Sequence, residues 1–318
     1  MRITAVKMAV PPRIQTADEL ASLIHRSEDW ILQHTGVAFR RVADDDVSPA
    51  QLAAVAAKEA IEATGTPDLI LYAGALTQQL VPDTSAFVQR ELGLDGVPSF
   101  SVNQTCLSFI AALQVADGLL RVGTYTRVLI CAGELATRGR SFNEPESAAL
   151  LGDGAAAAMV EYSSESDSDL ISSSLETWSE GIELCSVRAG NHPPPRPDMS
   201  HDALFCFHML GPQLYRFVRP RLRRFLTHFL ATAGSSIDQV QLVVPHQASG
   251  PGLRLLEQSG FSTERIVNIV GDYGNCVAAS IPMALAVAVE EGRISRGDQV
   301  LLVGTAAGVS LGAALLRW

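Results

Sequence analysis

This 318-residue chain has no uninterrupted apolar run long enough to cross a bilayer, which excludes an ordinary membrane-spanning helix. It is also short of positive charge: 24 Lys and Arg face 34 Asp and Glu, and a net charge of −10 excludes general nucleic-acid binding. Met1 and Arg2 lead into a strand-like stretch rather than a signal peptide. The five cysteines are odd in number, without CxxC spacing, and predict reduced thiols. Together these absences predict a soluble, cytoplasmic protein.

Apolar segments with the pattern of strands alternate with segments of helical pattern. Their apolar residues are continuous rather than alternating, which indicates burial on both faces and hence a sheet covered by helices. The composition, 47% hydrophobic and 18% charged, suits such an α/β protein. We predict strands at 67–76, 98–104, 126–134, 155–163, 240–247, 265–271, 299–306 and 309–318, and helices at 49–65, 106–123 and 280–294.

The order of these elements occurs twice, although the two parts of the sequence share few letters. We therefore predict two duplicated halves, 1–163 and 164–318, with 164–206 as the least regular stretch. Corresponding loops of such halves meet near one pseudo-twofold axis. Cys106, His246 and Asn275 stand at or just after the ends of predicted strands, so we expect them to converge on one cleft.

Cys106 is the candidate nucleophile because it follows a predicted strand and opens a predicted helix. The positive end of the helix dipole favours the thiolate, which is the form that attacks a thioester carbonyl. Most free cysteines are simply small buried apolar residues, and we interpret the other four in this way. Taken alone, His246 after a buried strand and Asn275 in a Gly-Asn turn also have ordinary interpretations; their matched positions make them candidates.

Several segments resemble those of the β-ketoacyl-acyl-carrier-protein synthase III family, in the thiolase superfamily. The resemblance extends over essentially the whole chain. It implies a thiolase-like five-layer αβαβα fold from two pseudo-duplicated halves, working as a homodimer. The segments that carry it are EDWILQHTGV (28–37), VNQTCLSF (102–109), LLGDGAAAAMV (150–160), VVPHQA (243–248), YGNCVAASIP (273–282) and GVSLGAALLRW (308–318).

The same resemblance implies a decarboxylative Claisen condensation. An acyl group would pass from acyl-CoA or an acyl carrier protein to Cys106, and the carbanion left when a malonyl thioester loses carbon dioxide would attack it. His246 and Asn275 would donate hydrogen bonds to the enolate, and the backbone N–H groups of Cys106 and Ala307 would form a second oxyanion hole. No metal or redox cofactor is implied. The product would be a β-keto thioester or ketone, in a specialised pathway rather than in primary fatty-acid initiation.

Several departures from the family concern the acyl pocket. TCLSF places the bulkier Leu107 beside the nucleophile, and GTAAG (304–308) places Thr305 where the family has phenylalanine and Ala307 where it has glycine. Val81 matches a phenylalanine that closes the acyl pocket from the partner subunit in the family. The smaller side chain is expected to admit a longer or branched acyl group.

The residues that would face CoA match the family only in part. Trp30 matches the tryptophan that stacks on adenine, but His34 replaces an arginine and NEPESAA (143–149) lacks the arginine that completes the stack. HQASGPGLR (246–254) moves a further arginine away from the histidine. These departures weigh against free CoA as the acyl donor.

A basic island lies between Asp202 and Asp238, where there is no acidic residue. On a chain of net charge −10 it would attract an acidic acyl carrier protein, and it matches the place where the family docks its carrier. The alternative is a solvated basic helix face, with Pro220 kinking or beginning the helix. The island consists of Arg216, Arg219, Arg221, Arg223 and Arg224.

Other activities stay open at this point. One is acyl transfer to a hydroxyl or amine, although relatives that acylate oxygen commonly carry aspartate in place of Asn275. Another is non-decarboxylative condensation of two acyl thioesters, whose catalysts carry a glutamate near Leu80 and Val81 that QQLVPD (78–83) lacks. A non-catalytic protein of the same fold is a third. A metal site is disfavoured because no zinc spacing links Cys185, His192, His201, Cys206 and His208.

Overall fold

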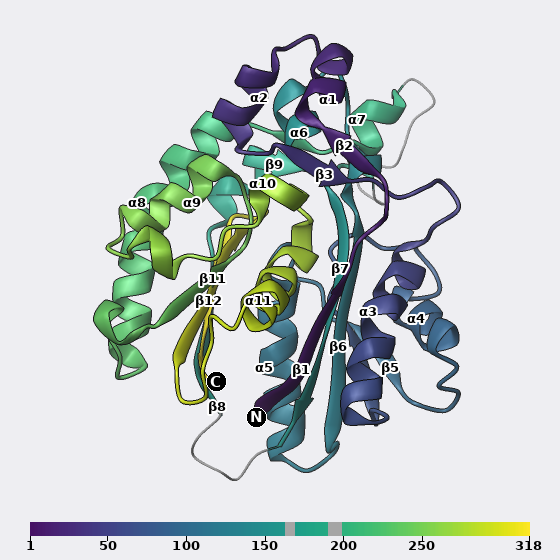
Figure 1. The fold of residues 1–318 in the computed structure, drawn as a ribbon, viewed down its shortest axis with the longest axis vertical. Helices are drawn as coiled ribbons and strands as arrows, with labels where there is room; N and C mark the ends of the chain where they lie inside the picture. Colours follow the sequence, from purple (N-terminus) through teal and green to yellow (C-terminus); the bar gives the residue numbers. More distant parts are fainter. Residues whose placement is uncertain (163–168, 190–198) are drawn as a thin grey trace.

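Two sheets lie side by side, with one helical layer between them and one on each outer face (Figure 1). The computed structural model describes residues 1–162, 169–189 and 199–318. The five-layer α/β arrangement predicted from the sequence is confirmed. The middle layer holds α5 (Ser108–Arg121) and α11 (Ser280–Glu290), and the outer layers hold α3 (Pro49–Thr64) with α4 (Thr84–Leu92), and α8 (Gly211–Thr232) with α9 (Gly250–Glu257).

The first sheet has the strand order β1-β7-β6-β4-β5. β4 is parallel to both β5 and β6, whereas β7 runs antiparallel to β6 and to β1. Because parallel strands need crossover connections, the helices that follow β4 and β5 return the chain across the sheet. The strands are β1 (Arg2–Ala9), β4 (Leu69–Tyr72), β5 (Ser99–Ser101), β6 (Arg127–Leu135) and β7 (Asp153–Glu161).

The second sheet repeats this pattern in the order β11-β12-β13-β8. β11 is parallel to β12, and β13 runs antiparallel to both β12 and β8. The strand predicted at 265–271 is reduced to one parallel bridge between Val243 and Ile266, at the place that β5 takes in the first sheet, and Val270–Tyr273 form α10. The strands are β8 (Asp169–Thr177), β11 (Leu242–Pro245), β12 (Gln299–Ala306) and β13 (Ser310–Arg317).

The stretch 164–206, predicted to be the least regular, contains a full strand of the second sheet. β8 pairs with β13 from Asp169 to Thr177. Its sequence DLISSSLET replaces the expected apolar run with three serines, which hid the strand. The predicted boundary between residues 163 and 164 lies outside the described residues.

α3 shows why the outer layer packs closely on the first sheet. Ser48 caps the helix in a reciprocal arrangement with Gln51, and the buried face of the helix is almost entirely alanine. Such small side chains allow a short helix-to-sheet distance: a Cβ placed on Gly133 of β6 would lie 2.2 Å from the carbonyl oxygen of Pro49. Close packing of this kind fixes the position of β6 relative to α3, and therefore the position of the loop that follows β6.

Short elements form a cap at one end of the sandwich, at the top of Figure 1. The chain termini lie at the opposite end. Among the described residues, no helix combines the length and the apolar character that a membrane span requires. The cap consists of α1 (Ala17–Ile24), α2 (Glu28–Thr35), α6 (Pro145–Leu150), α7 (His201–Phe205), α10, β2 (Ile14–Thr16), β3 (Phe39–Arg41), β9 (Cys185–Ser186) and β10 (His208–Met209).

Candidate active site

Cys106 lies in the tight turn between β5 and α5, two residues before the helix begins at Ser108. The turn is well tied down. Asn103 Oδ1 accepts the N–H of Thr105 at 2.9 Å, and the Ser108 hydroxyl donates to the Thr105 carbonyl at 2.6 Å while accepting the N–H of Gln104 at 3.0 Å. The thiol is partly buried and packs against the main hydrophobic core.

The resting thiol does not have the low pKa expected for a helix N-terminus. Burial raises the pKa of Cys106, and the neighbouring Cys185 and Glu134 act in the same direction. The helix begins only at Ser108, so the thiol lies outside its first turn while losing most of its contact with water. Cys106 therefore rests as a thiol, and acylation requires loss of its proton as the substrate binds.

His246 follows β11 directly, and its backbone N–H donates to the carbonyl of Val303 at 2.8 Å. The side chain is 5% exposed, and its Nδ1 has no hydrogen-bond partner among the described residues. Burial lowers the pKa of His246 to about 4. The imidazole is therefore neutral near pH 7 and keeps one N–H to donate to a substrate oxygen.

Asn275 is held by both its backbone and its side chain and is 9% exposed. Its backbone donates to Leu150 at 2.8 Å and accepts from Gly152 at 3.1 Å. Its Oδ1 accepts the N–H of Val277 at 2.8 Å, and its Nδ2 donates to the carbonyl of Ala248 at 3.3 Å. The carboxamide is thus oriented by a hydrogen bond to Ala248, which is two residues after His246 in the chain, and a second Nδ2 hydrogen is still available.

The loops that carry Cys106 and Asn275 have matching backbones in the two halves. Thr105, with φ of 50°, stands three residues before α5, and Val277, with φ of 47°, stands three residues before α11. Left-handed backbone costs a residue with a Cβ atom about 1–2 kcal/mol, so the surrounding fold must impose it. The duplication therefore extends to the conformation of the candidate loops.

Gly304 of β12 is where the Cys106 turn and His246 meet. A Cβ on Gly304 would lie 2.7 Å from the Cβ of His246 and 3.0 Å from Cδ2 of Leu107. Leu107 is fully buried and packs equally closely on Gly312. The Cys106 turn also reaches the start of β13, where Gln104 Nε2 donates to Ser310 Oγ at 3.1 Å. Ser310 begins β13 directly after the turn that contains Ala307.

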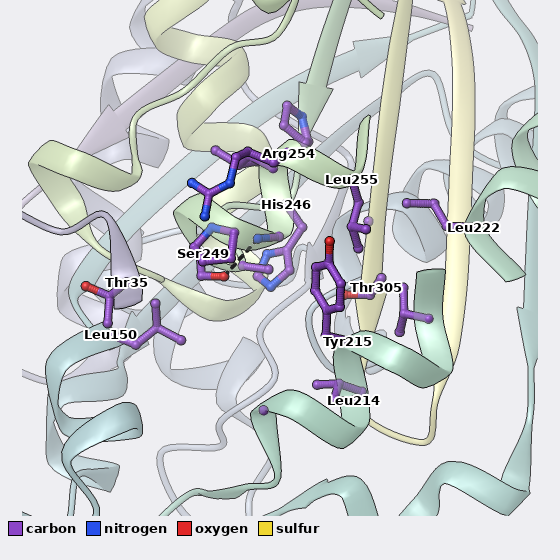
Figure 2. A pocket seen from close by; sticks show the side chains of 18 of the residues that line it. Thr35, Leu150, Leu214, Tyr215, Leu222, His246, Ser249, Arg254, Leu255 and Thr305 are labelled. Atoms are coloured by element: carbon purple, nitrogen blue, oxygen red, sulfur yellow. Dashed lines mark hydrogen bonds between the residues drawn. The ribbon is translucent and has the colours of Figure 1, made fainter. Parts of the chain in front are cut away.

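A cavity of about 460 Å³ opens from this point between α8, α9 and the ends of β11 and β12. Figure 2 shows the side chains of Tyr215, Thr305 and Arg254 around His246. The volume is typical of sites for extended small molecules, and most of the wall is apolar. Among the described residues, the wall includes His246 and Thr305 but not Cys106, Asn275, Ala307, Leu107 or Val81. The catalytic and substrate-binding roles predicted for all seven residues stay predictions.

The remaining candidate residues lie outside this cavity. Val81 and Leu80 are 81% and 84% exposed, on the loop between β4 and α4. The Trp30 ring stacks on His34, with ring centroids 4.3 Å apart. Four of the five arginines of the basic island point to solvent from α8, whereas Arg221 is paired with Glu180. The exposed ones are Arg216, Arg219, Arg223 and Arg224.

One sequence expectation about an arginine needs correction, and one of two alternatives for a proline is excluded. Arg254, expected to be displaced from the site, lines the cavity, because the three extra residues after Ala248 only move it one turn along α9. Pro220 does not begin a helix: α8 runs through it from Gly211 to Thr232.

Sequence reasoning missed Glu134, the penultimate residue of β6, which is fully buried. Its carboxylate accepts the N–H groups of Ala75 at 2.5 Å and Leu76 at 3.3 Å, and that of Ala278 from the other half. Burial is the main reason that its pKa is raised to about 8, against the effect of these donors. An acidic residue at the end of an apolar strand was the available signal.

The structure does bring three possible metal ligands together, although not the set considered from the sequence. Atoms of His201, Asp202 and Cys206 lie within 4.8 Å of one another on and beside α7. His201 is exposed, Asp202 already accepts from Ser141 at 2.5 Å, and Cys206 donates to the carbonyl of Arg140 at 3.4 Å. His192 lies outside the described residues.

Comparisons with known proteins agree with this architecture. Residues 100–179 match the family described as 3-Oxoacyl-[acyl-carrier-protein (ACP)] synthase III, and residues 230–318 match its C-terminal part. The chain is 32% identical to Beta-ketoacyl-[acyl-carrier-protein] synthase III of Syntrophomonas wolfei, over 100% of this chain and 97% of the relative. It is 31% identical to that of Neisseria meningitidis, over 100% and 99%.

The crystal structure of 3-oxoacyl-[acyl-carrier-protein] synthase III from Aquifex aeolicus superposes with a TM-score of 0.91 at 30% identity, covering 100% of this chain and 99% of that one. The Thermus thermophilus enzyme superposes with a TM-score of 0.90 at 31% identity, covering 100% and 99%. OleA from Xanthomonas campestris, at 22% identity and a TM-score of 0.87, covering 100% and 98%, shares the fold. By sequence over its full length and by the arrangement of its layers, the chain belongs to the β-ketoacyl-[acyl-carrier-protein] synthase III family of acyltransferases.

Proposed function

We propose that this protein forms a carbon–carbon bond by decarboxylative Claisen condensation of a Cys106-bound acyl group with a malonyl thioester. One observation carries the proposal above all. The Cys106 turn and His246 flank the same glycine, Gly304, and Asn275 donates to the carbonyl of Ala248, two residues after His246 in the chain. Of these groups, His246 lines an apolar cavity. A nucleophile and two neutral hydrogen-bond donors held beside such a cavity are what this reaction needs.

Acylation is the first half-reaction. The Cys106 sulfur attacks the carbonyl carbon of an acyl thioester, the carbonyl electron pair moves to oxygen, and collapse of the tetrahedral species expels the carrier's sulfur. The proton lost by Cys106 ends on the departing thiol. Backbone N–H groups of Cys106 and Ala307 are suited to the oxyanion, and each such donor typically contributes a factor on the order of 10² to 10³ in rate.

Condensation is the second half-reaction. The C–C bond to the malonyl carboxylate breaks, carbon dioxide leaves, and the electron pair forms an enolate on the remaining thioester. Neutral His246 and the Asn275 carboxamide donate to that oxygen, a role supported by the lowered pKa of the imidazole. The enolate carbon then attacks the acyl carbonyl and Cys106 leaves as thiolate. Every step uses side chains and backbone of this chain, so we expect no metal or cofactor.

The protein is further proposed to work as a homodimer in the cytoplasm. Leu80 and Val81 are 84% and 81% exposed, and apolar residues this exposed on one loop suit burial by a second subunit. In that arrangement Val81 would close the partner's acyl pocket, with room for a longer or branched chain.

An acyl carrier protein is proposed to dock on the outer face of α8. Arg216, Arg219, Arg223 and Arg224 are exposed there, while the opposite face of the same helix lines the cavity through Leu214, Val218 and Leu222. A carrier bound to these arginines would stand beside the cavity entrance, so its prosthetic arm could reach His246.

The two half-reactions can be tested separately. Intact-mass spectrometry after incubation with acyl thioesters should show one acyl addition that disappears in Cys106→Ala. Acylated enzyme mixed with a malonyl thioester should then release carbon dioxide. His246→Ala and Asn275→Ala should keep acylation while slowing carbon dioxide release by about 100-fold or more. Acylation without any carbon dioxide release, with transfer of the acyl group to a hydroxyl or amine, would refute the condensation.

A further inference from the structure

The cavity has a buried inner end and an exposed rim. His246 lies at the inner end, whereas His34, Glu146 and Arg254 line the same cavity and are exposed. A thioester placed at His246 would extend its pantetheine arm through the apolar part toward this rim. The first phosphate of the arm's carrier would therefore meet these three side chains.

The rim offers one free positive charge. Within the described parts of the chain, the Arg254 guanidinium makes no hydrogen bond and no ion pair, although it lies on the cavity wall (Figure 2). Its position on the second turn of α9 is held by a well-capped helix, in which Ser249 Oγ accepts the N–H of Gly252 at 3.1 Å. A guanidinium that is unpaired and exposed at a cavity mouth is well suited to a phosphodiester.

The rim also carries a negative charge at a place that would otherwise favour anions. A Cβ built on Gly211, the first residue of the 22-residue helix α8, would lie 2.9 Å from Oε2 of Glu146. The carboxylate thus occupies the positive end of the helix dipole. Among the described residues Glu146 has no ion-pair partner, so its charge is felt by any further phosphate that approaches.

Beside this rim, His34 covers one face of Trp30. The ring of His34 covers Trp30 with centroids 4.3 Å and planes 19° apart, and His34 Nδ1 donates to the Trp30 carbonyl at 2.8 Å. Arg26 also lies 5.5 Å from the centroid of the Trp30 ring. A purine base could stack on the face of Trp30 that His34 covers only by displacing His34 and breaking its hydrogen bond.

We propose that this rim selects thioesters whose phosphopantetheine is attached to a protein over thioesters of free CoA. Arg254 binds the single phosphodiester, Glu146 repels the additional phosphates, and His34 blocks the base. CoA brings roughly four negative charges to the rim near pH 7, whereas a protein-linked arm brings about one. The proposal rests on the proposed function, because it places the thioester at His246 and Cys106.

The test compares one acyl group on three carriers: uncharged pantetheine, CoA and an acyl carrier protein. The rate of Cys106 acylation, followed by intact mass, should be at least about tenfold lower with CoA than with the carrier protein at equal low concentration. Glu146→Gln should raise the CoA-to-pantetheine rate ratio about fivefold at low salt, and less at high salt. Arg254→Ala should slow the carrier-protein substrate about fivefold without affecting pantetheine.

Glu257→Gln is the matched control, because Glu257 is exposed on α9 but does not line the cavity. It should leave every ratio unchanged. The inference is overturned if the CoA thioester acylates Cys106 as fast as the carrier-protein thioester. It is also overturned if Glu146→Gln does not change the ratio of the CoA rate to the pantetheine rate, because the rim then does not distinguish the carriers. If the pantetheine thioester fails to acylate Cys106 at all, the proposed function falls, and this inference with it.

Discussion

At the scale of single residues, Gly304 decides how the nucleophile turn and the imidazole fit together. It lies in the interior of β12, where its missing side chain leaves just enough room for the Cβ of His246 and for Leu107. The bulky Leu107 beside the nucleophile is therefore explained by packing between the halves: it fills the space above Gly304 and Gly312.

Gly304→Ala should consequently damage the site. The added methyl group would lie 2.7 Å from the His246 Cβ and must displace it, which costs about 1–3 kcal/mol of stability. Because misplacing a catalytic group by about 1 Å can cost 100-fold in rate, carbon dioxide release should fall by that order. Urea unfolding and a decarboxylation assay measure the two effects.

Gly118→Ala is the control for that change. A Cβ on Gly118, within α5, would meet no described atom within 4 Å, and its φ is not left-handed. Alanine is the better helix former, so this variant should be as active as the wild type and up to about 1 kcal/mol more stable. Normal decarboxylation by Gly304→Ala would show that the close packing of His246 and Leu107 on Gly304 does not determine the position of the imidazole.

At the scale of elements, α8 contains a proline in its interior, where proline is unfavourable. Pro220 is exposed in the interior of a 22-residue helix, where it removes one hydrogen bond to the carbonyl of Arg216. Water can solvate that exposed carbonyl, which explains why the helix continues. The folded protein is nevertheless less stable than it would be with an uninterrupted hydrogen-bond pattern in α8.

Pro220→Ala should therefore raise the free energy of unfolding, by up to about 3 kcal/mol, without loss of acylation activity. Pro212→Ala in the first turn of the same helix serves for comparison. A residue there has no intrahelical acceptor for its N–H, so this change should be nearly neutral. Urea titrations at fixed protein concentration compare the two; equal effects would mean that α8 has already adapted its shape to Pro220.

The elements also show what could be predicted from the sequence. Continuous apolar runs correctly predicted β4, β6, β7, β11, β12 and β13. Strands buried on both faces consist almost entirely of apolar residues, whereas loops do not. β8 was missed because its serines lack that composition. The strand at 265–271 was overestimated because the apolar residues there form only a single bridge to β11. Arg254 could not be placed, since helix geometry decides where an inserted turn puts a side chain.

At the scale of the whole molecule, the duplication was visible in the order of elements, but the contact between the halves was not. Glu134 forms that contact: from the end of β6 it binds the loop after β4 and the N–H of Ala278, three residues after Asn275. Sequence order cannot reveal a hydrogen bond between segments about 140 residues apart, whereas a fully buried carboxylate in the structure demands such partners.

The raised pKa of Glu134 predicts a distinct dependence of stability on pH. Burial raises this pKa to about 8, so between its ordinary value of 4.5 and about 8 the folded protein holds a proton that the unfolded chain has released. Stability contributed by this group is therefore lost as the pH rises through that window, by at most about 1.4 kcal/mol per pH unit. His246, with its pKa lowered to about 4, acts in the opposite direction, but only below its ordinary value of 6.5. The window from pH 6.5 to 8 thus isolates the contribution of Glu134.

Glu134→Gln tests this prediction, because glutamine does not titrate. At pH 6.5 the free energy of unfolding of the variant should be lower than that of the wild type. By pH 8 it should approach the wild-type value, as measured in urea titrations at constant ionic strength. Parallel curves for the two proteins would mean that the three N–H donors keep the carboxylate ionised throughout, and that the link between the halves is an anion at all these pH values.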